Sequence, residues 1–137
     1  MSIFNIFNVV GSALSAQSVR LNTIASNLAN ADVVSPTPEG AYRARQAVFA
    51  TVLDRTTQDQ RSAPVKVAGI VESQVPARKE YAPHHPQADA EGYVYRSNVN
   101  VVEEMANMIS ASRSYQSNVE VLNASKQMLL STLRIGQ

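Results

Sequence analysis

Apolar residues recur at alternating intervals of three and four along the last third of the chain, residues 97–137. This segment has no proline, and its first glycine is Gly136. Eight of the ten stripe positions are apolar or aromatic, Ser112 and Lys126 being the exceptions. The spacing predicts one long helix with a coiled-coil-like seam, formed by Val101, Met105, Met108, Tyr115, Val119, Leu122, Leu129 and Leu133. A helix of roughly 35 residues is about 50 Å long, so it must be buried against something else, and we expect the stripe to serve both helix packing and assembly.

Both ends of this helix are encoded locally. Asn100 is followed three residues later by Glu103, the spacing of a capping box in which each side chain accepts a hydrogen bond from the other residue's backbone amide. Glu104 adds negative charge to the first turn, where the helix dipole favours it. At the far end, Arg134 lies in the last turn and Gly136 is placed to be the C-cap.

A second stripe of the same spacing runs through the first 31 residues. Gln17 is its one polar member, and it either sets the register of the pairing or is tolerated at the margin. The apolar members are Phe7, Val10, Leu14, Leu21, Ile24, Leu28 and Ala31. The opposite face is Ser, Asn, Thr and Ala, and Arg20 is the one charged side chain. We expect the back of this helix also to meet protein; the alternative is a hairpin helix with a weakly polar outer face.

The middle of the chain holds all six prolines, and its pattern predicts short strands and loops. Alternation predicts strands over residues 42–52 and 65–75, and a short strand over 78–82 that pairs with the second. Residues 54–63 are polar and predict a mobile loop, and residues 83–97 predict an extended connector. The predicted fold is therefore mainly α with a small β-rich insertion, and the terminal helices pair antiparallel as one discontinuous domain.

The expected organisation has four segments. Residues 1–34 and 98–137 supply the two helices of the discontinuous domain. Residues 35–82 form the β-rich middle and residues 83–97 the connector. A two-helix hairpin buries too little surface to be stable alone. We therefore expect a subunit of a helical or annular assembly with repeated heterologous contacts, whose ends order on incorporation. The alternative is a free-standing coiled-coil adaptor or binding module.

Composition excludes several function classes. The net charge of +1 gives no sign of a nucleic-acid surface. The chain has no cysteine, which removes disulfides and thiol chemistry. No apolar stretch reaches the length of a membrane span, and the N-terminus does not resemble a cleaved signal peptide.

One group of residues is a candidate for metal binding or acid–base catalysis. It consists of His84, His85 and Asp89, so a small hydrolase or metal enzyme is a further alternative. Prolines at 83 and 86 exclude a regular helix there, and the chain has no third histidine. We expect no cofactor, no metal and no catalytic residue.

Several motifs resemble those of bacterial flagellar basal-body rod proteins. They cover both ends and the connector, namely ALSAQSVRLNTIASNLANA (13–31), YAPHHP (81–86), ADA (88–90), EGYV (91–94) and NVNVVEEMANMISASRSYQSNVEVLNASKQML (98–129). The N-terminal motif is shared widely across rod and hook proteins. The connector running into residues 98–129 is similar to the short, proximal-rod member of the family.

The resemblance implies a structural role rather than an enzymatic one. Such subunits are exported without cleavage by the flagellar type III export apparatus and assemble in the periplasm, in the rod of the basal body. The rod transmits torque from the membrane ring to the distal rod and hook. The implied partners are other copies of the chain and the rod and basal-body subunits FlgB, FliE, FlgF and FlgG, with no nucleic acid and no membrane span.

Overall fold

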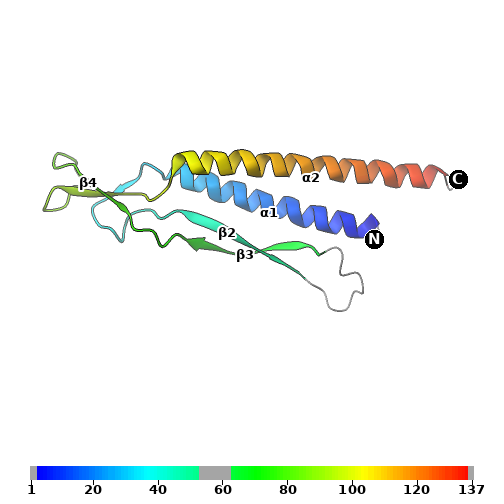
Figure 1. Cartoon of the computed structure of the whole chain (residues 1–137), viewed down its shortest axis with the longest axis horizontal. Helices are drawn as coiled ribbons and strands as arrows, with labels where there is room; N and C mark the ends of the chain where they lie inside the picture. The colour runs from blue at the N-terminus through cyan, green and yellow to red at the C-terminus, as the bar shows by residue number, and fades with distance from the viewer. Residues whose placement is uncertain (1–2, 53–62, 136–137) are drawn as a thin grey trace. The chain divides into compact units, whose positions relative to one another are not determined.

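Two long helices lie at the two ends of the chain and pack against each other (Figure 1). The computed structural model describes residues 3–52 and 63–135. Helix α1 spans Ile3–Ala29 and helix α2 spans Val101–Ile135. The predicted pair of long terminal helices is confirmed. The predicted loop at 54–63, apart from Ala63, and the predicted cap at Gly136 lie outside the described residues.

The chain divides into two compact units, and each contains a part of both helices. Unit 1 comprises Met1–Leu21, Ala47–Gly69 and Ser110–Gln137. Unit 2 comprises Asn22–Gln46 and Ile70–Ile109. Because the start of α1 shares a unit with the end of α2, and the end of α1 with the start of α2, the two helices run antiparallel.

Local hydrogen bonds explain where the helices stop and start. At the end of α1, the Asn30 side-chain amide donates to the Ser26 carbonyl at 2.8 Å. The Ala31 backbone amide donates to the Leu28 carbonyl at 3.3 Å, which tightens the last turn. At the start of α2, the Glu104 amide donates to the Asn100 carbonyl at 2.9 Å, the first bond of the helix.

The inner face of α2 is smaller and more polar than the predicted stripe. Its buried residues are Glu104, Ala111 and Ser125, and the half-buried Met108, Asn118, Leu122 and Leu129 lie between and beyond them. Met108, Leu122 and Leu129 belong both to this face and to the predicted stripe. Glu104, Ala111 and Ser125 each lie one residue before a position of the stripe. Small side chains at the contact allow two helices to approach closely.

Within the described residues, five strands lie between the helices. They are β1 (Val34–Ser35), β2 (Arg45–Thr51), β3 (Val65–Glu72), β4 (Arg78–Tyr81) and β5 (Tyr93–Arg96). Alternation predicted strands in both places, and β2 and β3 pair with each other as a two-stranded ribbon. Strands β1, β5 and β4 form a second, antiparallel sheet in that order, with β5 in the centre. The short sheets together with the two helices confirm the predicted fold class.

The prediction that residues 78–82 pair with residues 65–75 is wrong. Strand β4 pairs with β5, from Arg78 opposite Arg96 to Tyr81 opposite Tyr93. Side chains explain this choice: the Tyr81 and Tyr93 rings meet edge to face at 5.1 Å, and the Lys79 ammonium lies 3.8 Å from the Tyr93 ring centroid. Cross-strand aromatic pairs stabilise a sheet by roughly 0.2–1 kcal/mol each.

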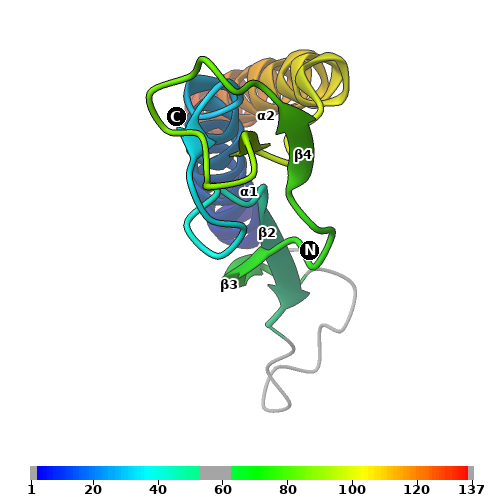
Figure 2. The ribbon, with the colours of Figure 1, turned by 90° about the vertical axis from the view of Figure 1, so that its left-hand side faces the viewer.

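The loop that joins β4 to β5, residues 82–92, is closed by Asp89 and Gly92 and can be traced in Figure 2. Gly92 adopts a φ of 81°, a conformation that side chains disfavour. A Cβ at this position would lie 3.0 Å from Cε2 of Tyr81 and 3.1 Å from Cβ of Pro83. The glycine is therefore required both by the backbone and by the close approach of β4.

Candidate assembly surface

Asn27, near the end of α1, is the centre of a buried hydrogen-bond network in unit 2. Its side chain is completely buried. Oδ1 accepts from the Arg45 backbone amide at 2.9 Å and from the Tyr42 hydroxyl at 3.0 Å. Nδ2 donates to the Arg45 carbonyl at 2.8 Å and to Oε1 of Glu104 at 3.1 Å. One side chain thus joins α1, the start of β2 and the first turn of α2.

Glu104 lies in the first turn of α2, as the sequence predicted, and it has a further role there. The structure buries its side chain against Asn27. Burial of a carboxylate is costly unless hydrogen bonds compensate. The Asn27 amide provides one such bond, so the orientation of Asn27 and the position of Glu104 depend on each other.

Asn98 makes a second connection within unit 2. Its Oδ1 accepts from the Ala44 amide at 2.7 Å, and its Nδ2 donates to the Val75 carbonyl at 2.7 Å. The same two segments are also bonded to each other, because the Ser73 amide donates to the Ala44 carbonyl at 2.8 Å. The segment leading into α2 is therefore tied to the segments that flank β2 and β3.

The predicted packing residues of α1 are all at least half-buried. Val10 and Ile24 are buried, and Phe7, Leu14, Leu21 and Leu28 are half-buried. The exposed positions between residues 5 and 29 form one narrow stripe of small or uncharged residues, Asn8, Gly11, Ser15, Ser18, Asn22, Ala25 and Ala29. In unit 1 the Ser12 hydroxyl accepts from the Val65 amide at 3.1 Å, so β3 also contacts this helix.

The predicted packing residues of α2 divide into two groups. Met108, Val119, Leu122 and Leu129 are half-buried. Val101, Met105, Tyr115 and Leu133 are exposed. Helix α2 therefore leaves apolar side chains in solvent near both ends and at its middle, and exposed apolar residues that cluster commonly mark an interaction site.

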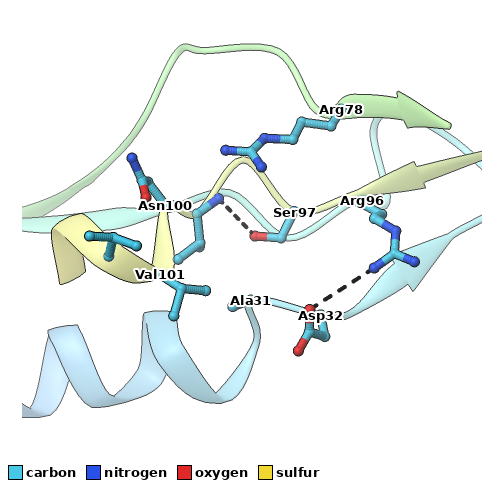
Figure 3. A pocket seen from close by; sticks show the side chains of 9 residues that line it. Ala31, Asp32, Arg78, Arg96, Ser97, Asn100 and Val101 are labelled. Atoms are coloured by element: carbon cyan, nitrogen blue, oxygen red, sulfur yellow. Dashed lines mark hydrogen bonds and ion pairs between the residues drawn. The ribbon is translucent and has the colours of Figure 1, made fainter. Parts of the chain in front are cut away.

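A pocket of about 260 Å³ lies at the start of α2 in unit 2 (Figure 3). Ala31, Val99, Val101 and Val102 give it an apolar part, and Asp32, Arg78, Arg96, Ser97 and Asn100 a polar part. Arg96 pairs with Glu80 and, at 4.0 Å, with Asp32. In Figure 3 the Arg78 side chain extends from β4 toward the start of α2, and it makes no ion pair with any residue that the structure describes.

The predicted helix cap lies at the edge of this pocket. Asn100 immediately precedes α2 and its carbonyl accepts the first helical bond. Glu103 is exposed in the first turn. The reciprocal side-chain bonds of a capping box between Asn100 and Glu103 stay a prediction.

In the structure, Asp89 has a role in the loop that the two histidines do not share. Within the described residues there is no group of three His, Cys, Asp or Glu that could hold a metal. His84 and His85 are exposed, and the Nδ1 of His85 accepts from the Gln87 amide at 3.1 Å. Asp89 closes the loop instead: its Oδ1 accepts from the amides of Glu91 at 2.9 Å and Tyr93 at 2.8 Å.

These bonds predict an acid-sensitive loop. The Tyr93 amide, followed by the Glu91 amide, holds the pKa of Asp89 below its ordinary value. A depressed pKa in the folded state means that the stabilisation is present at neutral pH and is lost as the pH falls through that pKa. We expect the amide resonance of Tyr93, followed by NMR from pH 7 to pH 2, to shift with the titration of Asp89.

Two variants test this assignment. Asp89→Asn retains an acceptor oxygen but does not titrate, so the Tyr93 resonance should become insensitive to acid. Asp32→Asn, which removes an exposed carboxylate elsewhere in unit 2, should leave the titration unchanged. A Tyr93 resonance that still titrates in Asp89→Asn would contradict the assignment.

Sequence reasoning did not identify Asn27, Glu104 and Asn98 as structural centres. A weak signal existed for Asn27, because it is polar and lies three residues after the apolar Ile24 on a strongly periodic helix. No signal existed for its partners, since Arg45 and Glu104 are brought together only by the tertiary fold.

Comparison with known proteins places these features in a family. The model of a family described as "Flagella basal body rod protein" matches residues 7–37, and that of "Flagellar basal body rod FlgEFG protein C-terminal" matches residues 90–135. The flagellar basal-body rod protein FlgC of Salmonella typhimurium is 53% identical over 137 residues, covering all of both chains. The chain belongs to the flagellar basal-body rod protein family. FlgC of Yersinia enterocolitica is 52% identical over the same length, and FlgC of Borreliella burgdorferi 38% over 152 aligned positions.

The two family models correspond to the two helices of this rod protein. The first covers most of α1 and the strand that follows, and the second covers β5 and all of α2. Among the described residues, no helix combines the length and apolar character needed to cross a membrane.

Proposed function

We propose that this chain is a structural subunit of the proximal rod of the bacterial flagellar basal body. The observation that carries the proposal is the identity of 53% with a FlgC protein over the full length of both chains. The resemblance of residues 81–94 and 98–129 to the proximal-rod member supports the same assignment. The subunit acts mechanically and is not an enzyme.

The mechanical role rests on how the helices are held. A drive shaft must resist shear between its parts, and paired helices resist it where side chains from several segments are locked together. Asn27 provides such a lock in unit 2 through hydrogen bonds to Arg45, Tyr42 and Glu104. We infer that torque from the membrane ring passes through these helices to the distal rod and hook.

The proposed partners are other copies of this chain and the subunits FlgB, FliE, FlgF and FlgG. The proposed location is the rod in the periplasmic space, reached through the flagellar type III export apparatus without a cleaved signal peptide. Apolar residues at both ends of α2, such as Val102 and Leu133, support assembly because they are exposed in the single chain.

Complementation of a strain that lacks the gene tests the proposal. The full chain should restore swimming, and the tagged protein should copurify with basal bodies. Chains that lack residues 1–30 or 105–137 should restore neither, because each deletion removes one of the two paired helices. The double variant His84→Ala/His85→Ala, which alters two exposed side chains, should swim normally.

Two results would overturn the proposal. Full swimming without the helices would show that they do not carry assembly. A full-length protein that restores swimming but is absent from basal bodies would instead favour the free adaptor, and loss of swimming in the histidine variant would favour a chemical role for His84 and His85.

A further inference from the structure

The pocket in unit 2 is lined by two arginines whose surroundings differ (Figure 3). Arg96 already has partners, because Glu80 pairs with its Nε and Asp32 lies 4.0 Å from its Nη1. Arg78 is exposed on β4 and makes no ion pair with any residue that the structure describes. The pocket therefore offers a guanidinium group whose hydrogen-bond donors are available to a ligand.

The charges at the pocket favour a ligand with a single negative charge. The Asp32 side chain is 96% exposed, so water screens its attraction to Arg96 and its displacement costs little. Without Asp32, the guanidinium groups of Arg78 and Arg96 face one carboxylate, that of Glu80. One further negative charge restores the balance, whereas a dianion such as phosphate brings more charge than the pocket can neutralise.

The rest of the pocket favours a short apolar group. Its apolar wall is formed by Ala31, Val99, Val101 and Val102, and Val99 is buried, which fixes that side of the wall. The volume of about 260 Å³ is smaller than the roughly 300–1,000 Å³ of pockets that hold drug-sized ligands. The space suits a chain of a few carbon atoms.

We propose that this pocket binds one carboxylate carried on a short apolar stem. Arg78 and Arg96 hold the carboxylate, because guanidinium groups bind carboxylates through parallel N–H···O bonds, and the valines cover the stem. A glutamate side chain of another protein and a free short-chain carboxylic acid share this chemistry. The proposal does not depend on the proposed function, since all the lining residues belong to unit 2.

A titration of the full-length chain with sodium butyrate at pH 7 and constant ionic strength tests the pocket. We expect saturable shifts of the backbone amide resonances of Ser97, Val101 and Val102 in NMR spectra. Butan-1-ol has the same stem without the charge, so it should cause no saturable shift. Inorganic phosphate should bind more weakly than butyrate.

Four variants assign the binding to the pocket residues. Arg78→Gln should weaken butyrate binding by about tenfold or more, because charge-assisted hydrogen bonds are lost. Lys66→Gln, which removes an exposed cation of β3, should bind butyrate normally. Asp32→Asn should strengthen binding, since a competing carboxylate is removed, whereas Glu39→Gln, which removes another exposed carboxylate of unit 2, should not. A purely structural role of Asp32 predicts the opposite change, weaker binding.

Three results would overturn the proposal: no saturable shift with butyrate, equal affinities for Arg78→Gln and the natural chain, or tighter binding of phosphate than of butyrate. Swimming of a complemented strain distinguishes the two sources of the carboxylate. A protein side chain as the natural occupant predicts that Arg78→Gln reduces swimming and Lys66→Gln does not. A free acid predicts normal swimming of Arg78→Gln although butyrate binding is lost, and this result leaves the proposed function standing.

Discussion

Asn27→Asp is expected to destabilise the subunit by about 3–5 kcal/mol, the cost of leaving a buried charge uncompensated. Asn27 donates two hydrogen bonds through Nδ2, to the Arg45 carbonyl at 2.8 Å and to Oε1 of Glu104 at 3.1 Å. Aspartate has the same shape but presents oxygen to both acceptors, one of them a carboxylate. Because small domains are stable by only about 5–15 kcal/mol, much of the purified protein should unfold at low urea concentration.

The measurement is urea unfolding followed by circular dichroism. Asn22→Asp is the matched control, since Asn22 lies on the same helix with an exposed side chain, and its midpoint should stay close to that of the natural protein. Equal midpoints for the two variants would show that the Asn27 network does not stabilise the fold.

Ala111→Asp is expected to prevent the close packing of α2 in unit 1. Ala111 is completely buried on the inner face of α2, so a larger charged side chain would have to displace its neighbours. Overpacking a core costs about 1–3 kcal/mol, and burial of the unpaired charge adds several more. We expect swimming to be abolished and the unfolding midpoint to fall sharply.

Ala124→Asp is the control for this change, because Ala124 is an exposed alanine further along the same helix and in the same unit. The loss of helix propensity costs less than about 0.7 kcal/mol, so unfolding of this variant should be nearly normal. If Ala111→Asp unfolds like Ala124→Asp, the helices do not pack through Ala111.

The sequence determined the two helices and most of the strands. Stripes of apolar residues without proline located α1 and α2 within a few residues of their ends, since helix formation depends on periodicity and on local capping. Alternation of apolar and polar residues located β2 and β3, because a strand also follows a local period. The division into four segments stays a prediction.

The tertiary structure alone decided which faces are buried and which strands pair. Periodicity predicted a stripe for helix packing or assembly along α2; the buried face is centred on Glu104, Ala111 and Ser125, and stripe residues such as Met105 and Leu133 are exposed. A single sequence cannot distinguish an apolar face that packs internally from one reserved for a neighbouring molecule. Likewise, Asn27 became a centre of the fold only through Arg45 and Glu104, which are distant along the chain, because burial and hydrogen-bond partners are properties of the assembled fold.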